Sequence, residues 1–214
     1  MSRLLIHVEG PTEKNFVDQV LREYLVGQGY FTVAARLQGH AQLKSRRGGG
    51  RAWEGVKREI TEHLSEDAGV VVTTFVDFYG LPPSWPRRVG ATGPVPIETA
   101  MEQETGSRRF LPFVMMHEFE ALLFSDCATF CRSIERVGLE VQLSKIRASF
   151  ASPEEINDSL QTAPSKRIEA LMPRYRKVFH GVNAAREIGL DRMRAECPHF
   201  REWLEKLVAL RAKL

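Results

Sequence analysis

The 214-residue sequence predicts an α/β fold, with a parallel sheet flanked by helices and followed by a C-terminal helical extension. Nearly continuous apolar segments alternate with segments of helical apolar spacing, in the order strand, helix, strand, helix, strand. This order is typical of parallel strands joined by right-handed crossovers. Beyond residue 126 the apolar spacing is mostly helical. We therefore expect an α/β core over residues 1–126 and an extension over residues 127–214 that packs on it as one structural unit.

The first predicted elements are a strand, a tight turn and a helix. Residues 3–8 read as a strand buried on both faces, as in a parallel sheet. His7 is the polar interruption of this strand, and we interpret it as a core histidine hydrogen-bonded to a neighbour. Gly10 and Pro11 end the strand, Thr12 can cap, and apolar residues at helical spacing predict a helix over residues 13–27.

The later elements follow from the same patterns. Strands are expected at 30–37, 69–76 and 110–116, with a helix at 52–64. Residues 80–96 are rich in proline and glycine, which predicts an irregular excursion. In the extension we expect helices over 130–137, 143–150, 153–160, 165–172, 184–196 and 200–210.

Composition gives little direct evidence of function. A net charge of +3 is too small to indicate a polyanionic partner by itself. We find no stretch of about 20 apolar residues and no signal-peptide pattern, so we expect a cytoplasmic protein. The three cysteines, Cys127, Cys131 and Cys197, are expected to be buried reduced thiols; a zinc set with His199 is the less favoured alternative.

Carboxylates follow three predicted strands at the points where they end. Glu9 follows the first strand and Asp77 the third, while Glu118 and Glu120 follow the fourth. Parallel strands gather their carboxyl ends at one edge of a sheet, where ligands bind. Converging carboxylates repel one another unless a cation neutralises them, and oxygen ligands suit Mg²⁺ or Mn²⁺. His117 is a possible ligand, a proton shuttle or a histidine satisfied at the sheet edge. For Glu9 the alternative is a simple interaction with the positive end of the next helix.

Two basic segments are candidates for phosphate binding. The stretch LKSRRGGGR could fold over a phosphate backbone, although it lacks the G-K-[ST] ending of a P-loop. PSKR stands at a predicted helix start, where free N–H groups and basic side chains can hold phosphate together. Solvated surface positions are the alternative in both places. The candidate phosphate-binding residues are Arg46, Arg47, Arg51, Lys166 and Arg167.

The stretch VEGPTEKNFV resembles the first motif of the Toprim domain, especially its V-E-G-x-T-E form in nucleases of the OLD (overcoming lysogenization defect) type. FVDFYGLP, HEFEALLFSD, PEEIND, PSKRIEAL and CPHFREWLEKL further resemble a bacterial Toprim-like family of unknown function, often discussed alongside ATPases and phage defence. The resemblance implies that Glu9 does acid-base work or binds metal, and that Asp77 binds Mg²⁺. The second aspartate of the Toprim D-x-D motif is absent, because Tyr79 stands there. Glu118 or Glu120 then supplies the missing ligand, or catalysis is weakened.

The sequence therefore predicts a Mg²⁺-dependent nuclease or phosphotransfer enzyme acting on DNA or RNA, with an ATPase as a possible partner. Its candidate catalytic residues are Glu9, Asp77 and Glu118, and Glu120 joins them as a candidate ligand. One alternative is a catalytically silent module that binds nucleic acid or an ATPase. A phosphoacceptor domain of the receiver type is a weaker alternative, because no lysine clearly follows a later strand.

Overall fold

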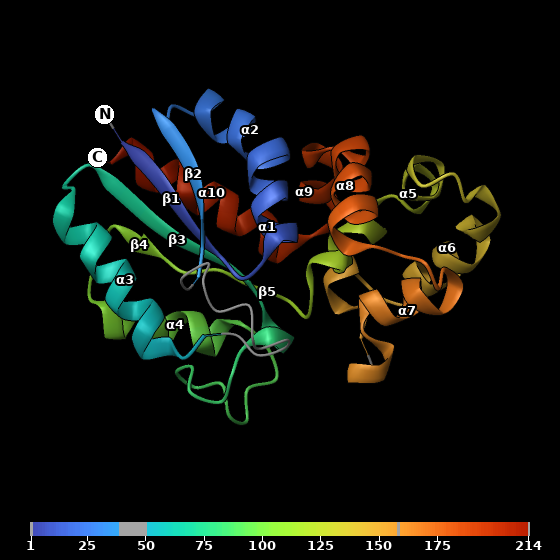
Figure 1. Ribbon diagram of the computed structural model, residues 1–214, viewed down its shortest axis with the longest axis horizontal. Coiled ribbons are helices and arrows are strands. Elements are labelled where there is room, and N and C mark those ends of the chain that lie inside the picture. The colour runs from blue at the N-terminus through green and yellow to red at the C-terminus, as the bar shows by residue number, and fades with distance from the viewer. Residues whose placement is uncertain (1, 39–50, 158, 214) are drawn as a thin grey trace.

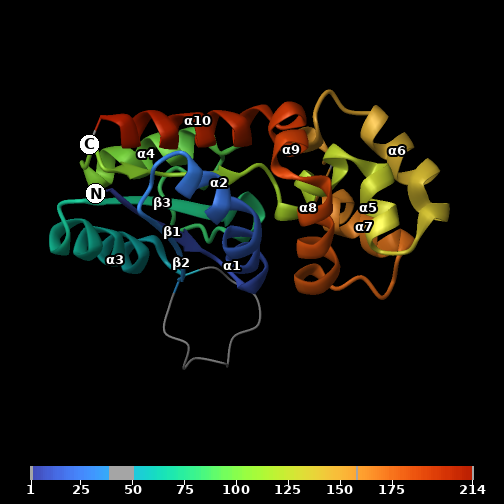
Figure 2. The ribbon, with the colours of Figure 1, turned by 90° about the horizontal axis from the view of Figure 1, so that it is seen from above.

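The computed structural model describes residues 2–38, 51–157 and 159–213 and confirms the α/β fold (Figures 1 and 2). Within these ranges the sheet has five strands, and all their pairings are parallel. The strand order is β2-β1-β3-β4, with β5 also paired to β3. The strands are β1 (Arg3–Val8), β2 (Thr32–Leu37), β3 (Val70–Asp77), β4 (Phe110–Leu111) and β5 (Val114–Met115).

The first two helical regions connect these strands as the sequence predicts. A continuous helix follows β1, formed by α1 (Pro11–Phe16), the π-helical turn Val17–Leu21 and α2 (Arg22–Gly27). The next is α3 (Trp53–Glu66), which leads into β3. Nearly all residues of the central strands β1 and β3 are buried or partly buried. This burial on both faces explains why the two strands have nearly continuous apolar sequences.

The region from 95 to 115 differs from the prediction. Helix α4 (Val95–Thr105) begins inside the proline-rich segment, because proline suits the first turn of a helix. The strand expected over 110–116 is divided into β4 and β5. Pro112 lies between them and has no N–H for the ladder. The Oγ1 of Thr74 fills the gap by donating to the carbonyl of Phe113 and accepting from its N–H, each at 2.9 Å.

The extension is helical, but two predicted helices are wrong. Residues 153–160 form only short 3-10 segments, and the helix expected over 184–196 is broken at Gly189, whose φ is 80°. The helices that form are α5 (Cys127–Ser133), α6 (Glu140–Ala148), α7 (Pro164–Leu171), α8 (Val182–Ile188), α9 (Leu190–Glu196) and α10 (Pro198–Ala212). Helices α5 to α9 stand beside the sheet, whereas α10 runs back along it (Figures 1 and 2). The boundary at residue 126 stays a prediction.

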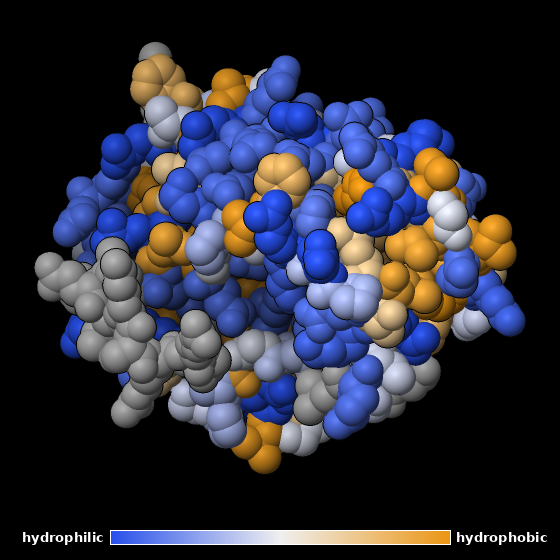
Figure 3. All heavy atoms as spheres, turned by 45° about the vertical axis from the view of Figure 1, so that its right-hand side comes forward, coloured by the Kyte–Doolittle hydropathy of each residue, from blue (hydrophilic) through white to orange (hydrophobic). Residues whose placement is uncertain are grey.

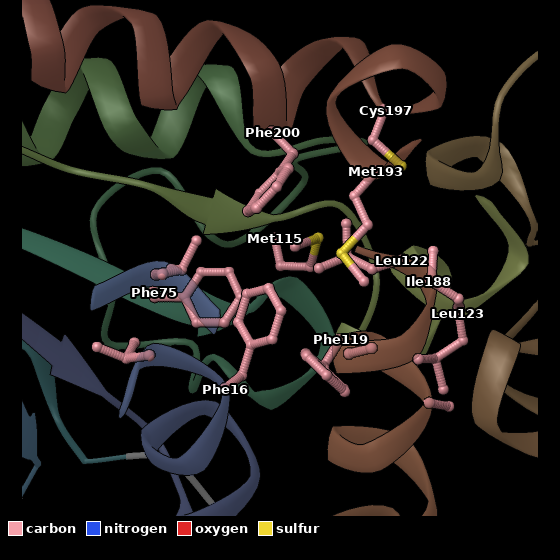
Figure 4. Packing of buried hydrophobic residues seen from close by; sticks show 14 of the residues in the cluster. Phe16, Phe75, Met115, Phe119, Leu122, Leu123, Ile188, Met193, Cys197 and Phe200 are labelled. Carbon is pink, nitrogen blue, oxygen red and sulfur yellow. The ribbon is translucent and has the colours of Figure 1, made fainter. Parts of the chain in front are cut away.

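Two apolar layers enclose the sheet. One packs α3 and α4 against the face that carries Val70, Val72 and Val76. The other packs the helix after β1 and α10 against the opposite face, and continues into the extension. Figure 4 shows this second layer, where Phe16 and Phe75 stack 5.7 Å apart and Phe119 meets Phe16 edge-on at 5.2 Å. Side chains on both sides of residue 126 therefore share one core.

The surface of the extension is mixed in polarity. Figure 3, which brings this part forward, shows apolar patches among mostly hydrophilic atoms. The three cysteines are free and buried, as expected. A search of the described helices found none that combines the length and the apolar character needed to cross a membrane.

Candidate functional site

Carboxyl groups from two neighbouring strands and the segments beside them gather at one edge of the sheet. Glu9 follows β1 and Asp77 ends β3. Their charges act on each other and on those of nearby acids, as the shifts in their pKa values show. We call this group the acidic edge, and it consists of Glu9, Glu13, Asp77, Glu118 and Glu120. The four carboxylates predicted from the sequence are thus brought together. Glu13, expected only to start the helix, joins them from the first turn of α1.

The turn after Asp77 makes room for Glu9. A Cβ placed on Gly80 would lie 2.3 Å from Oε2 of Glu9 and 2.6 Å from Oε1, closer than any side chain tolerates. The carboxylate of Glu9 therefore lies directly against the backbone of residue 80. Any larger residue at position 80 would force the carboxylate of Glu9 to move away.

The segment HEFE is tied to Asp77 and to the extension by two backbone hydrogen bonds. The N–H of Phe119 donates to Oδ1 of Asp77 at 3.0 Å. The N–H of Ser165, in the first turn of α7, donates to Oε2 of Glu118 at 3.0 Å. Glu118 has extended backbone and a 3-10 helix starts at Phe119, so Phe119 enters the core while the acids on either side of it stay at the acidic edge.

Lys177 reaches into the acidic edge from the extension. Its Nζ lies 3.0 Å from Oε2 of Glu120, whose side chain is fully buried. Burial alone would lower the pKa of Lys177, but Glu120, Glu118 and Asp77 raise it above its ordinary range. This role could not be predicted from the stretch PRYRKVFH, because its composition is that of an ordinary helical surface. The contact depends on how the π-helical turn Lys177–Gly181 packs, 57 residues beyond Glu120.

Burial and mutual repulsion raise the pKa values of Glu9, Glu13, Asp77 and Glu120. Burial is the main cause for Glu9, Glu13 and Asp77; the charge of Glu118 adds to it at Glu9, that of Glu9 at Glu13, and those of Glu13 and Glu9 at Asp77. Burial raises the pKa of Glu120 to about 7, although Lys177 opposes the shift. Among the described residues, the Lys177 ammonium group is therefore the cation that faces these five carboxyl groups, and it leaves their ionised forms under-neutralised.

The chemistry of this donor set fits a hard divalent cation. Carboxylate oxygens are its preferred ligands, and a divalent charge would remove the repulsion that raises these pKa values. Over the ranges that the structure describes, no three His, Cys, Asp or Glu side chains are arranged to hold a metal ion as they lie. Closing around an ion would therefore require side-chain rotation at the acidic edge.

An aromatic group occupies the place where the Toprim resemblance would put a second aspartate. Tyr79 stacks on His117 with ring centroids 5.2 Å apart, and its hydroxyl accepts a hydrogen bond from the Nδ2 of Asn157. His117 adopts a left-handed φ of 68°, which is uncommon for a residue with a side chain. Tyr79 thus offers an aromatic ring and a hydroxyl beside the acidic edge, but no carboxylate.

The candidate phosphate-binding residues are dispersed. Arg46 and Arg47 lie outside the described residues. Arg51 forms an ion pair with Glu59 on α3, and Lys166 pairs with Glu169 at 2.6 Å. Arg167 donates to the carbonyl of Thr162 and lies over the ring of Phe150. Phosphate binding by these residues stays a prediction.

Comparison with known proteins places the chain in a family. No curated protein and no solved structure matches it. The model of one protein family, described as a domain of unknown function (DUF4276), matches residues 8–208. Since this match spans nearly all of the 214 residues, the chain belongs to the DUF4276 family.

Proposed function

We propose that this protein is a Toprim-like, Mg²⁺- or Mn²⁺-dependent phosphoryl-transfer enzyme that cleaves nucleic acid in the cytoplasm. The observation that carries the proposal is the acidic edge, where acids from two neighbouring parallel strand ends and the adjoining segments are under-neutralised by Lys177. Such a site suits a reaction in which negative charge on phosphate oxygens must be balanced. The resemblance of VEGPTE to the first Toprim motif supports the same assignment.

Glu9, Glu13 and Asp77 are the residues that would hold the cation, with Glu118 or Glu120 completing the set. A bound cation would orient an attacking water and stabilise charge on the leaving oxygen. Where Glu9 is not itself a ligand, its carboxylate would instead accept the proton of that water as a general base. Lys177 keeps Glu120 in place and adds the positive charge that a phosphate group requires.

Metal-dependent cleavage of single- and double-stranded DNA and RNA tests the proposal. We expect the native chain to cleave at least one of them with Mg²⁺ or Mn²⁺ and to lose activity with a chelator. Glu9→Gln and Asp77→Asn should each reduce the rate by a factor of 100 or more, in the range seen when a general base or a catalytic electrostatic group is removed. Glu187→Gln, at an exposed position of α8, is the matched control and should keep full activity. Equal rates in all four proteins would refute the assignment.

A catalytically silent binding module is the second candidate, and Tyr79 is the observation that favours it. Tyr79 replaces a ligand of the Toprim motif and is already engaged with Asn157 and His117. This candidate predicts nucleic-acid binding that a chelator leaves unchanged, together with no cleavage under any metal. Gel-shift titrations with and without chelator distinguish the two functions.

We also propose an ATPase partner and a role in phage defence, on the family resemblance alone. The test is co-purification of the full chain with ATPases encoded beside its gene, followed by cleavage assays with and without ATP. Cleavage that requires both ATP and the ATPase would support the partnership. The same rate with the chain alone would contradict it.

A further inference from the structure

A second group of polar side chains lies on the face of the sheet that α3 covers. His7 comes from the middle of the sheet on β1, and Glu59 and His63 lie one turn apart on α3. The rings of His7 and His63 are 5.5 Å apart between centroids and tilted by 58°. We call these three residues the histidine group.

Several polar atoms of the histidine group are buried without a hydrogen-bond partner among the residues that the structure describes. They are both ring nitrogens of His7, Nε2 of His63 and Oε2 of Glu59. His7 is 0% exposed, so bulk water cannot form hydrogen bonds to its ring in place of the missing partners. The neighbour expected to hydrogen-bond His7 is therefore not found within the described part of the chain. Each such group costs about 1–3 kcal/mol, and together they favour a ligand that satisfies them at once.

The chemistry of these atoms is that of a transition-metal site. An uncharged imidazole keeps a lone pair on one ring nitrogen, and the ring of His7 is fully buried with no described hydrogen-bond partner for either nitrogen. Neutral imidazole nitrogens and a carboxylate oxygen are typical Zn²⁺ ligands. Two imidazoles on one tetrahedral ion, with Zn–N bonds of about 2.1 Å, place their ring centres roughly 5 Å apart. The observed 5.5 Å is close to that spacing.

The surroundings supply orienting contacts and an entry path. Arg51 holds Oε1 of Glu59, which leaves Oε2 for a ligand. Nδ1 of His63 faces Oε2 of Glu66 at 3.9 Å, so a carboxylate stands behind this ring, as it does behind many metal-binding histidines. His63 also lines an open cavity of about 230 Å³ between α3 and strands β1 and β2, with Glu66 and Asp67 on its wall.

We propose that His7, His63 and Glu59 bind a first-row transition-metal ion of the Zn²⁺ class, with water or a small ligand completing its shell from this cavity. Small rotations must close the site, since across the described part of the chain no three His, Cys, Asp or Glu side chains converge as they lie. The nearby charges of Arg36 and Arg51 oppose a cation. We therefore expect weaker binding than in a closed structural zinc site.

Titration of the chelator-treated full chain with Zn²⁺ and Co²⁺ tests the proposal. We expect one equivalent to bind independently of the acidic edge, the melting temperature to rise with Zn²⁺, and Co²⁺ to show the visible bands of imidazole and carboxylate coordination without thiolate charge-transfer absorption. His63→Gln, at a partly exposed position that should tolerate the change, is expected to lose that equivalent. His180→Gln is the matched histidine control and should keep it.

Asp77→Asn separates this site from the proposed catalytic site. It should leave the Zn²⁺ equivalent in place, whether or not it abolishes cleavage. Failure of the native chain to bind Zn²⁺ or Co²⁺ would overturn the proposal and assign the histidine group to a buried water only. Full binding by His63→Gln would also overturn it.

Discussion

The substitution Glu120→Gln tests the electrostatics of the acidic edge through stability. The pKa of Glu120 is raised from 4.5 to about 7 in the folded chain, so its contribution to stability is fully present below pH 4.5 and is lost as the pH rises through 7. The side chain is fully buried, and each pKa unit corresponds to about 1.4 kcal/mol. The loss between pH 5 and pH 8 is therefore about 2–3 kcal/mol. Glutamine cannot ionise, so the variant Glu120→Gln should not show this loss of stability.

Urea unfolding of both proteins at pH 5 and pH 8 measures this effect. The free energy of unfolding of Glu120→Gln minus that of the native chain should rise by about 2–3 kcal/mol from pH 5 to pH 8. The two proteins must be compared because the lowered pKa of His7 makes both of them less stable at acid pH. This trend is opposite to that of Glu120, and it cancels in the difference between the two free energies of unfolding. Glu187→Gln, exposed on α8, should show no such change. A difference for Glu120→Gln that is the same at both pH values would refute the reasoning.

Three further substitutions test neighbouring contacts. Gly80→Ala should displace the carboxylate of Glu9 and abolish the rise of the melting temperature that we expect with Mn²⁺, while the circular dichroism spectrum stays native. An unchanged rise with Mn²⁺ would contradict the close approach of Glu9 to residue 80. Glu154→Ala removes the acceptor of two N–H groups in the first turn of α10, each at 2.9 Å, and should lower stability by about 1–2 kcal/mol with faster hydrogen exchange there. Thr73→Val leaves the buried Nε1 of Trp203 without its 2.9 Å acceptor and should cost about 1–3 kcal/mol in urea unfolding, whereas Thr61→Val, on the surface of α3, should cost less.

The sheet was predictable because a strand that is buried on both faces has a nearly continuous apolar sequence. β1 and β3 are such strands, and their predicted bounds agree with the structure to within one residue. The short edge elements were not predictable in the same way. Pro112 divides β4 from β5, and α4 begins among prolines that indicate a break rather than a helix.

The wrong helix at 153–160 has a long-range cause. Glu154 is buried and its carboxylate accepts hydrogen bonds from the N–H groups of His199 and Phe200 at the start of α10. These contacts lie 45 and 46 residues away, so local apolar spacing could not reveal them. They hold the segment in a turn instead of a helix.

The candidate site was partly predictable for a topological reason. Neighbouring parallel strands bring their carboxyl ends together, and this placed Glu9 and Asp77 side by side before any contact was known. The burial of Glu13 and the approach of Lys177 depend on how α1 and the extension pack. Likewise, the ring nitrogens of His7 lack described hydrogen-bond partners because of where α3 packs on the sheet. The apolar spacing of the sequence does not predict that packing.

The position of Lys177 gives the extension control over the charge of the sheet. Coulomb attraction falls with distance, so a shift of the turn Lys177–Gly181 that doubled the 3.0 Å separation from Glu120 would roughly halve their attraction. The acids would then compete more strongly for protons or for a metal ion. Any partner that moves α7 or α8 would thereby tune the cation affinity of strand ends that lie a hundred residues earlier in the chain.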